Sequence, residues 1–194
     1  MENIFANNFE INEFEMNRLN GHRSFTIWLT GLSGAGKTTL AKRLQKLLHS
    51  KKYKTKILDG DNLRTGLNKG LGFSEEDRKE NIRRTAEVSK LFNEAGVITI
   101  ASLITPTNEL RDLAKDIIGK DKTYMIWVDA PLSICEERDP KGLYAKARNG
   151  EIKNFTGIGA GFEEPISYDE KIDTTQMNPD DLALMIYHNI KHRI

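Results

Sequence analysis

The sequence is poor in the side chains that form disulfides and transition-metal cages. Its 194 residues include one cysteine, Cys135, so an internal disulfide is impossible. A lone cysteine of this kind is most often a small residue in or near a core, and it suits a reducing compartment. The four histidines are scattered, and none has a cysteine or acidic partner at the spacing that metal ligands need. We therefore expect no metal site built from histidine and cysteine.

The sequence also lacks a marked excess of charge and a long apolar run near its start. Lysine and arginine number 29 against 28 acidic residues, which gives a formal net charge of +1. This balance provides no overall attraction to nucleic acid or to anionic membranes. Residues 1–20 are rich in glutamate and asparagine and lack the continuous apolar stretch of a signal peptide or membrane span. We therefore expect a cytoplasmic protein that binds neither nucleic acid nor membrane.

The length and the hydrophobic pattern together predict the fold class. A chain of 194 residues lies in the size range that one hydrophobic core can organise. We expect residues 1–20 to be a loose N-terminal extension and residues 21–194 to form one domain. Short apolar runs alternate with longer amphipathic segments, as in a parallel sheet covered by helices on both faces. The predicted fold class is therefore α/β.

The pattern also places the individual elements. Strands are expected at residues 25–30, 56–59, 97–104, 124–129 and 170–174. Helices are expected at residues 37–50, 74–95, 108–118 and 180–192, and another should open after Pro131. The glycine-rich residues 157–161 are expected to be loose.

The turn between the first strand and the first helix matches the pattern G-x-x-x-x-G-K-[ST]. Its glycines let successive backbone N–H groups face inward, and the helix N-terminus adds about half a positive charge toward bound phosphates. Lys37 should reach the β- and γ-phosphates, and the Thr38 hydroxyl should help to coordinate Mg²⁺. The predicted triphosphate-binding residues are Gly31, Leu32, Ser33, Gly34, Ala35, Gly36, Lys37, Thr38 and Thr39.

Two carboxylates and an arginine follow the second strand in Asp59-Gly-Asp-Asn-Leu-Arg64. Open α/β sheets bind ligands at this carboxyl edge. One acid can serve magnesium, for which Asp59 is the candidate beside Thr38. Asp61 is the candidate that orients or deprotonates the attacking hydroxyl, because phosphoryl transfer depends mainly on positioning and charge neutralisation.

The long helix at residues 74–95 begins with a third group of polar side chains. By helical spacing, Arg78 and Asn81 lie near one face, and Phe73 stands just before the first turn. Arginine pairs with phosphate or sulfate oxygens, and a phenyl ring can stack on a purine. Taken alone, the segment suits a solvated charged helix equally well.

Taken in order, these segments resemble adenylylsulfate kinases. The matching blocks are Gly31–Thr38, Asp59–Arg64, Gly72–Arg78, Glu80–Arg84, Arg138–Tyr144 and Lys153–Gly157. The resemblance implies a P-loop NTPase fold, a homodimer and Mg²⁺-ATP as the phosphate donor. The implied reaction moves the γ-phosphate to the 3′-hydroxyl of adenosine 5′-phosphosulfate, and gives 3′-phosphoadenylylsulfate for sulfate assimilation.

The resemblance also implies roles for individual residues. Phe73 and Phe155 would sandwich the adenine of the acceptor, and Arg138 and Lys141 would begin a lid, about residues 138–163, that closes over ATP. Arg138 would thus join the ATP-binding residues. The implied acceptor-binding residues are Asp61, Arg64, Phe73, Arg78, Asn81, Ile104, Lys153 and Phe155. The implied catalytic residues are Lys37, Asp61, Arg78 and Lys141.

Two segments depart from the pattern that is commonest in the family. Where the family usually has Ser-Pro-Tyr-Arg or Ser-Pro-Phe-Arg, residues 105–108 read Thr-Pro-Thr-Asn, and Arg111 is the nearest basic residue. We assign no catalytic role to Thr105, because in-line transfer between two bound nucleotides needs no covalent relay. Residues 159–163, Gly-Ala-Gly-Phe-Glu, replace the family's Asp-Ser-Pro-Tyr-Glu, which could alter how the acceptor end of the lid closes.

Two other functions remain open. A kinase of the same architecture can act on another nucleotide, such as cytidine diphosphoramidate, although Phe73 and Phe155 favour a purine. A regulatory module that binds nucleotide without turnover is a different class, against which the intact Lys37 and Asp61 argue. Asp129 ends an apolar strand in the manner of a Walker B acid and is a further, weaker candidate for the metal.

Overall fold

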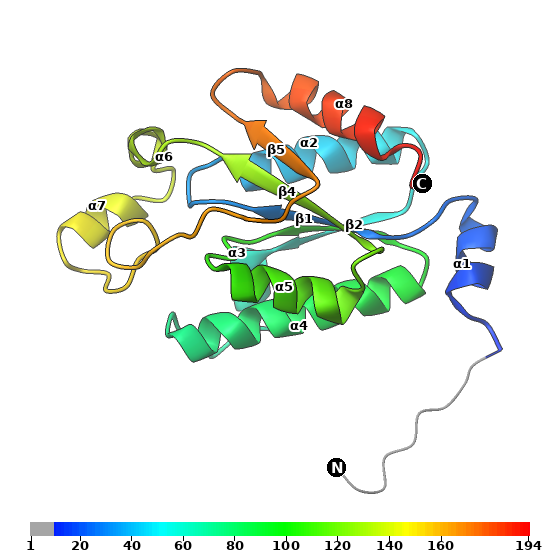
Figure 1. The fold of residues 1–194 in the computed structure, drawn as a ribbon, viewed down its shortest axis with the longest axis horizontal. Helices are drawn as coiled ribbons and strands as arrows, with labels where there is room; N and C mark the ends of the chain where they lie inside the picture. The colour runs from blue at the N-terminus through cyan, green and yellow to red at the C-terminus, as the bar shows by residue number, and fades with distance from the viewer. Residues whose placement is uncertain (1–9) are drawn as a thin grey trace, which may run out of the picture.

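A five-stranded sheet forms the centre of the fold within residues 10–194, which the computed structural model describes (Figure 1). Its order is β2-β3-β1-β4-β5, and all neighbouring strands run parallel. This confirms the predicted α/β class. Parallel strands place their carboxyl ends at one edge of the sheet. The strands are β1 (Thr26–Thr30), β2 (Thr55–Asp59), β3 (Ile98–Ser102), β4 (Thr123–Asp129) and β5 (Glu170–Asp173).

Helices cover both faces of the sheet (Figure 1). One face carries α2 (Lys37–Ser50) and α8 (Pro179–Ile190), which pack on each other. The opposite face carries α4 (Glu75–Glu94) and α5 (Asn108–Ile118), which also pack together. Shorter helices are α1 (Glu13–Asn20), α3 (Gly60–Arg64), α6 (Leu132–Arg138) and α7 (Leu143–Arg148).

The core lies on both sides of β1, whose five residues are all buried. Because side chains alternate along a strand, Ile27 and Leu29 join the cluster under α2 and α8, whereas Trp28 joins the cluster under α4 and α5. Trp127 and Cys135 are buried as well. The expectation that the lone cysteine lies in or near the core is therefore confirmed.

One prediction about the N-terminal extension is wrong. Residues 1–9 of it lie outside the described residues, but Glu13–Asn20 form helix α1 rather than a loose segment. The Asn12 side chain caps the helix by accepting from the Glu15 N–H at 3.2 Å, and Asn20 donates to Gly96 O at 2.9 Å. None of the helical residues is buried. Because polar contacts hold α1, the hydrophobic pattern gave no sign of it.

The strand expected at residues 97–104 ends earlier, at Ser102. The chain turns beyond it, and Thr105 takes a positive φ of 47°. The helices α3 and α7 were also not predicted, because each is too short to show an apolar stripe. Both instead depend on a carboxylate at the start: Asp59 caps α3, and Asp139 accepts from the Leu143 N–H at 2.9 Å in α7.

The glycine-rich residues 157–161, expected to be loose, form a closed turn. The carbonyl oxygen of Phe155 accepts from the N–H groups of Ile158, Gly159 and Ala160 at 3.0 to 3.1 Å. This turn is therefore held by its own backbone hydrogen bonds. Within residues 10–194, the structure contains no helix whose length and apolar character would let it cross a membrane.

Candidate active site

A cleft of about 1110 Å³ opens at the carboxyl edge of the sheet. It brings together the glycine-rich loop at residues 31–38, here called the P-loop, with α3, the start of α4 and the turn after β3. Residues on either side of α7, from 138–143 and 152–155, also line it. All the predicted site residues line it except Gly31, Leu32 and Ala35. The carboxyl edge therefore collects the residues predicted to bind triphosphate and acceptor in one space, although they come from segments far apart in the sequence.

Glycines shape the P-loop where other backbone approaches it. Gly34 has a φ of 77°, and a Cβ atom there would lie 2.7 Å from Cys135 O. A side chain at Gly31 would meet Val128 O at 2.2 Å. Gly36 precedes α2 at a φ of 98°. The loop thus wraps tightly over β4 and α6, and its backbone N–H groups lie at the N-terminus of α2, where the helix dipole favours an anion.

Lys37 is folded back onto the loop that it serves. Its ammonium group donates to Gly31 O at 2.9 Å and to Leu32 O at 2.7 Å. Burial lowers the pKa of Lys37 to about 8, because desolvation disfavours the charged form. The carbonyl partners hold the lysine at the mouth of the loop, from where a bound triphosphate would offer it a stronger, fully charged partner.

Thr38 and Asp59 face each other beneath the P-loop. The Thr38 hydroxyl donates to Asp59 Oδ2 at 2.8 Å, and Asp59 Oδ1 accepts from the Asp61 N–H at 3.2 Å. A hydroxyl and a nearly buried carboxylate are hard oxygen donors that fit Mg²⁺. Among the described residues, no three histidine, cysteine or acidic side chains converge on a metal site, so the remaining ligands of an ion would come from phosphate and water.

Asp61 directly contacts the segment predicted to form a lid. Its carboxylate forms an ion pair with the ammonium group of Lys141, between α6 and α7. Both side chains are about half exposed, at 61% for Asp61 and 49% for Lys141. The pair therefore joins the predicted acceptor-side acid to the predicted charge-neutralising lysine of the lid, at a place that stays open to solvent.

Arg64 and Phe73 form one wall of the cleft. The Arg64 guanidinium donates to Leu71 O at 2.9 Å and Gly72 O at 3.0 Å, and its centre lies 4.4 Å from the centroid of the Phe73 ring. Burial lowers the pKa of Arg64, which remains a cation at neutral pH. Phe73 is 59% exposed. A ring so exposed offers a stacking surface to a flat ligand.

Arg78 links α4 to the far part of the lid. Its guanidinium donates to Phe73 O at 3.0 Å, to Thr156 Oγ1 at 2.5 Å and to Asn154 O at 2.6 Å. Two of these three hydrogen bonds hold the residues on either side of Phe155, and the third holds the residue two places before α4. Asn81, one helical turn further, is buried and accepts from the Asn68 amide at 2.8 Å.

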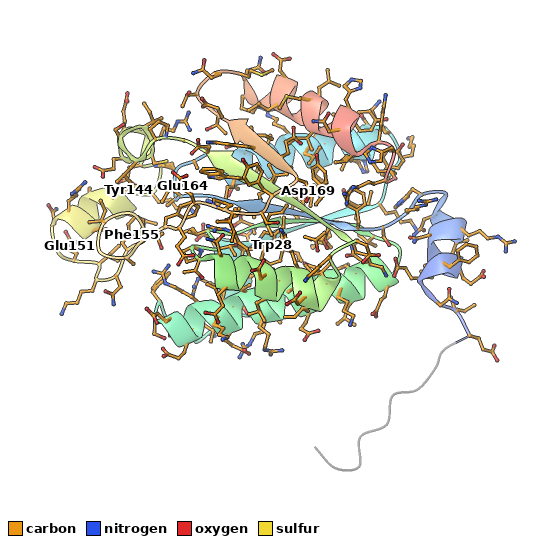
Figure 2. The ribbon with its side chains drawn as sticks, viewed as in Figure 1. Trp28, Tyr144, Glu151, Phe155, Glu164 and Asp169 are labelled. Atoms are coloured by element: carbon orange, nitrogen blue, oxygen red, sulfur yellow. The ribbon has the colours of Figure 1, made fainter. Side chains whose placement is uncertain are left out.

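Phe155 packs against Tyr144, with ring centroids 4.9 Å apart and planes at 86° (Figure 2). The Tyr144 hydroxyl donates to Ser33 O at 2.9 Å. Phe155 is therefore connected through Tyr144 to the P-loop. Tyr144 lies in the block Arg138–Tyr144 that resembles the family. A tyrosine there did not by itself predict a contact with both Phe155 and the P-loop.

Arg138 and Thr174 support the P-loop from the other side. The Arg138 guanidinium donates to Thr174 Oγ1 at 3.0 Å and to Thr174 O at 3.1 Å, and Thr174 donates to Ala35 O at 2.8 Å. Thr174, Met177 and Pro179 also line the cleft, and sequence reasoning missed them as site residues. Only the pairing of β5 beside β4 brings them there, and no local pattern signals that pairing.

Asp129 and Thr105, whose functional roles the sequence left in question, both make contacts that stabilise the fold. Asp129 pairs with Lys171 at 3.1 Å and lines a separate hollow beside Leu32 instead of the main cleft, which does not support a metal role. Thr105 is buried, and its hydroxyl accepts from Trp28 Nε1 at 2.9 Å. The Thr105 side chain is therefore engaged in the core.

Comparisons with known proteins agree with this geometry. The family model described as adenylylsulphate kinase matches residues 23–173. An adenylyl-sulfate kinase of Bacteroides thetaiotaomicron is 56% identical over 158 residues, which cover 81% of this chain and 79% of the relative. An adenylyl-sulfate kinase of Oceanobacillus iheyensis is 48% identical over 191 residues, which cover 98% of this chain and 96% of the relative.

A solved structure gives the same result. The APS kinase of Mycobacterium tuberculosis in complex with AMPPNP and APS superposes with a TM-score of 0.84 at 40% identity, and the match covers 87% of this chain and 98% of that one. The sequence and the structure thus agree over most of the chain, and the residues that the family model matches include 31–38 and 138–163. The chain belongs to the adenylylsulfate kinase family.

Proposed function

We propose that this protein transfers the γ-phosphate of ATP to the 3′-hydroxyl of adenosine 5′-phosphosulfate, giving 3′-phosphoadenylylsulfate and ADP. One observation carries the proposal: a single cleft joins the P-loop to Asp61, Arg64 and the two aromatic residues Phe73 and Phe155. Such a cleft can hold a triphosphate and a second, planar anionic ligand side by side. The family membership of the chain supports the same acceptor.

The donor side of the cleft binds and orients ATP. In this proposal the P-loop N–H groups and Lys37 hold the β- and γ-phosphates, while Arg138 and Lys141 add positive charge from the lid. Thr38 and Asp59 would hold Mg²⁺, which neutralises charge on the phosphates. Lys37 must leave its two carbonyl partners to meet the phosphates, and their negative charge favours its protonated form.

The acceptor side binds the second nucleotide. Phe73 and Phe155 would stack on its adenine, and the basic residues would pair with its phosphosulfate. The remaining proposed acceptor contacts are Arg64, Arg78, Asn81, Ile104 and Lys153. Asp61 would accept a hydrogen bond from the 3′-hydroxyl and orient its oxygen toward the γ-phosphorus. For this, Asp61 must exchange Lys141 for the hydroxyl, and Lys141 is then free to turn to the transferring phosphate.

The decisive experiment is ADP release by the purified protein with Mg²⁺-ATP and four separate acceptors. We expect strong turnover with adenosine 5′-phosphosulfate and weak or no turnover with AMP, CMP and cytidine diphosphoramidate. Preferred turnover of a cytidine acceptor would reassign the acceptor while retaining the kinase. Silence with all four would support a nucleotide-binding regulatory module.

The assembly and the location of the protein form a second part of the proposal. We propose a homodimer, as the family resemblance implies, and a location in the cytoplasm, as expected from the polar composition of residues 1–20. Sedimentation equilibrium on the full chain would measure the assembly, and a mass near twice the 22.0 kDa of one chain is expected. A mass of one chain at micromolar concentration would refute the dimer. Fractionation of cells with a tagged chain tests the location, and recovery with membranes would contradict it.

A further inference from the structure

The lid returns to the body of the protein along an irregular segment between α7 and β5. Apart from a bridge between Thr156 and Ala160, this segment has no strand pairing within the described residues. It carries Phe155 and Lys153 into the cleft at its start. Its geometry therefore depends on the points where side chains hold it to the rest of the fold.

The first such point is Arg78, which binds Asn154 and Thr156 on either side of Phe155. The second lies further along, at Glu163. The Glu163 carboxylate accepts from the Asn108 backbone N–H at 2.7 Å and from the Asn108 amide at 3.1 Å. Asn108 is the first residue of α5, so the carboxylate also lies at a helix N-terminus, where negative charge is favoured.

Arg111 holds the backbone at the same place. Its guanidinium donates to Glu163 O at 2.6 Å and to Asn108 Oδ1 at 2.8 Å, and its centre lies 5.0 Å from the Phe162 ring. The side chain is 1% exposed, and burial lowers its pKa to about 10. A third donor, Nε, points to Thr30 Oγ1 at 3.4 Å, directly before the P-loop. Arg111 thus spans from the end of β1 to the returning lid.

The same place adjoins the acceptor end of the cleft. The Glu163 N–H donates to Pro106 O at 2.8 Å, and Pro106 lines the cleft beside Ile104 and Thr105. Asn108 and Glu163 come from the two segments in which the sequence departs from the commonest family pattern. The structure brings these two segments into direct contact, so they form one unit.

We propose that Asn108, Arg111 and Glu163, here called the Glu163 anchor, position the acceptor half of the lid. In this inference, which rests on the proposed function, the anchor fixes the far end of the segment that Arg78 holds at its near end. Phe155 and the turn after it are then presented to the acceptor. The anchor residues touch no reacting atom, so they are positioning residues, and their loss should weaken acceptor binding without weakening ATP binding.

The test combines kinetics on three variants of the full chain. Glu163→Ala removes both hydrogen bonds from Asn108 and should raise the KM for adenosine 5′-phosphosulfate about tenfold, as expected for charged hydrogen bonds, with the KM for ATP within twofold of wild type. Glu163→Gln keeps an acceptor oxygen for Asn108 and should restore most of the loss. Glu164→Ala, at the neighbouring exposed position, is the matched control and should match wild type (Figure 2).

Hydrogen exchange supplies a readout that does not require turnover. The amides of Ile158, Gly159 and Ala160 donate to Phe155 O and report on the turn after it. In Glu163→Ala their exchange should become about tenfold faster, whereas amides of β1 and β3 should keep wild-type protection. If the wild-type protein phosphorylates no adenosine 5′-phosphosulfate, the proposed function fails, and this exchange measurement alone decides the anchor.

Two results would overturn the inference. Unchanged acceptor KM and unchanged exchange at residues 158–160 in Glu163→Ala would show that the anchor positions nothing. Equal rises in both KM values, together with faster exchange throughout the sheet, would show a general loss of stability instead of a local role.

Discussion

The ammonium group of Lys141 contacts the carboxylate of Asp61 and so joins the segment between α6 and α7 to helix α3. The group proposed to orient the attacking hydroxyl and the group proposed to neutralise the transferring phosphate thus pair with each other in this structure. Both are about half exposed, so solvent screens the pair and its contribution to stability is small. Ligands can therefore replace this contact at little cost.

The role of Asp61 predicts a large kinetic effect with an intact fold. Asp61→Asn removes the acceptor for the 3′-hydroxyl proton and should lower kcat by about 10²- to 10⁴-fold. Its melting temperature should stay within a few degrees of wild type, because the side chain is 61% exposed. The exposed Asp116→Asn on α5 is the control and should keep the wild-type kcat. A wild-type rate for Asp61→Asn would remove Asp61 from the mechanism.

Stacking on Phe73 predicts a selective loss of acceptor affinity. Phe73→Ala should weaken acceptor binding by about 1 to 3 kcal/mol, the range for a base on an aromatic ring, while ATP binding changes little. Isothermal titration with each nucleotide measures both affinities. Leu91→Ala, which removes another exposed apolar side chain on α4 outside the cleft, should change neither. An unchanged acceptor affinity in Phe73→Ala would refute the sandwich.

The lowered pKa of Lys37 predicts proton uptake when ATP binds. With a pKa of about 8, roughly half of the empty sites carry neutral Lys37 at pH 8, and bound phosphates favour the charged form. Binding of Mg²⁺-ATP should therefore take up about half a proton at pH 8 and far less at pH 6.5. Calorimetry in buffers of different ionisation enthalpy measures this uptake. Equal uptake at both pH values would contradict the assignment.

The lowered pKa of Lys37 also predicts how the free energy of unfolding changes with pH. The unfolded chain binds a proton at Lys37 up to its ordinary pKa of 10.5, whereas the folded chain releases it near 8. The unfolded state therefore binds more protons between these values, and the contribution of Lys37 to the free energy of unfolding should rise with pH in that window. Chemical denaturation of wild type and of Lys37→Met from pH 7 to 10 isolates this contribution, which should be absent in the variant.

The sequence alone predicted those parts of the site whose residues are close together in the chain. The P-loop and its flanking strand and helix were predicted because consecutive residues carry the whole pattern, and α2 begins at Lys37 as expected. Phe155 was found only through resemblance to a family, because a lone phenylalanine in an irregular segment has no period to identify it. Its packing on Tyr144 depends on the path of the lid.

The missed features share a physical cause. Thr174 reaches the P-loop only because β5 pairs with β4. No local sequence pattern predicts the order of the strands in the sheet. Arg111 lies in a predicted helix, but its burial follows from the return of the lid to Glu163. Helix α1 was missed because it is stabilised by polar caps and has no apolar stripe that a sequence pattern could reveal.

Thr105 provides a test of the buried contact that the structure assigns to it. Thr105→Val leaves Trp28 Nε1 without its acceptor in the core and should lower the free energy of unfolding by about 1 to 3 kcal/mol. Thr105→Ser keeps the hydroxyl and should stay close to wild type in urea denaturation. Equal stability of the two variants would show that the Trp28 contact contributes nothing.

The identity of the product shows directly whether the protein phosphorylates the 3′-hydroxyl of adenosine 5′-phosphosulfate. The purified protein would be incubated with Mg²⁺, ATP labelled at the γ-phosphate and adenosine 5′-phosphosulfate, and the labelled product identified by mass spectrometry and ³¹P NMR. We expect one labelled nucleotide, with the new phosphate on the 3′-hydroxyl and the sulfate retained. Label recovered only as inorganic phosphate, or on another acceptor atom, would contradict it.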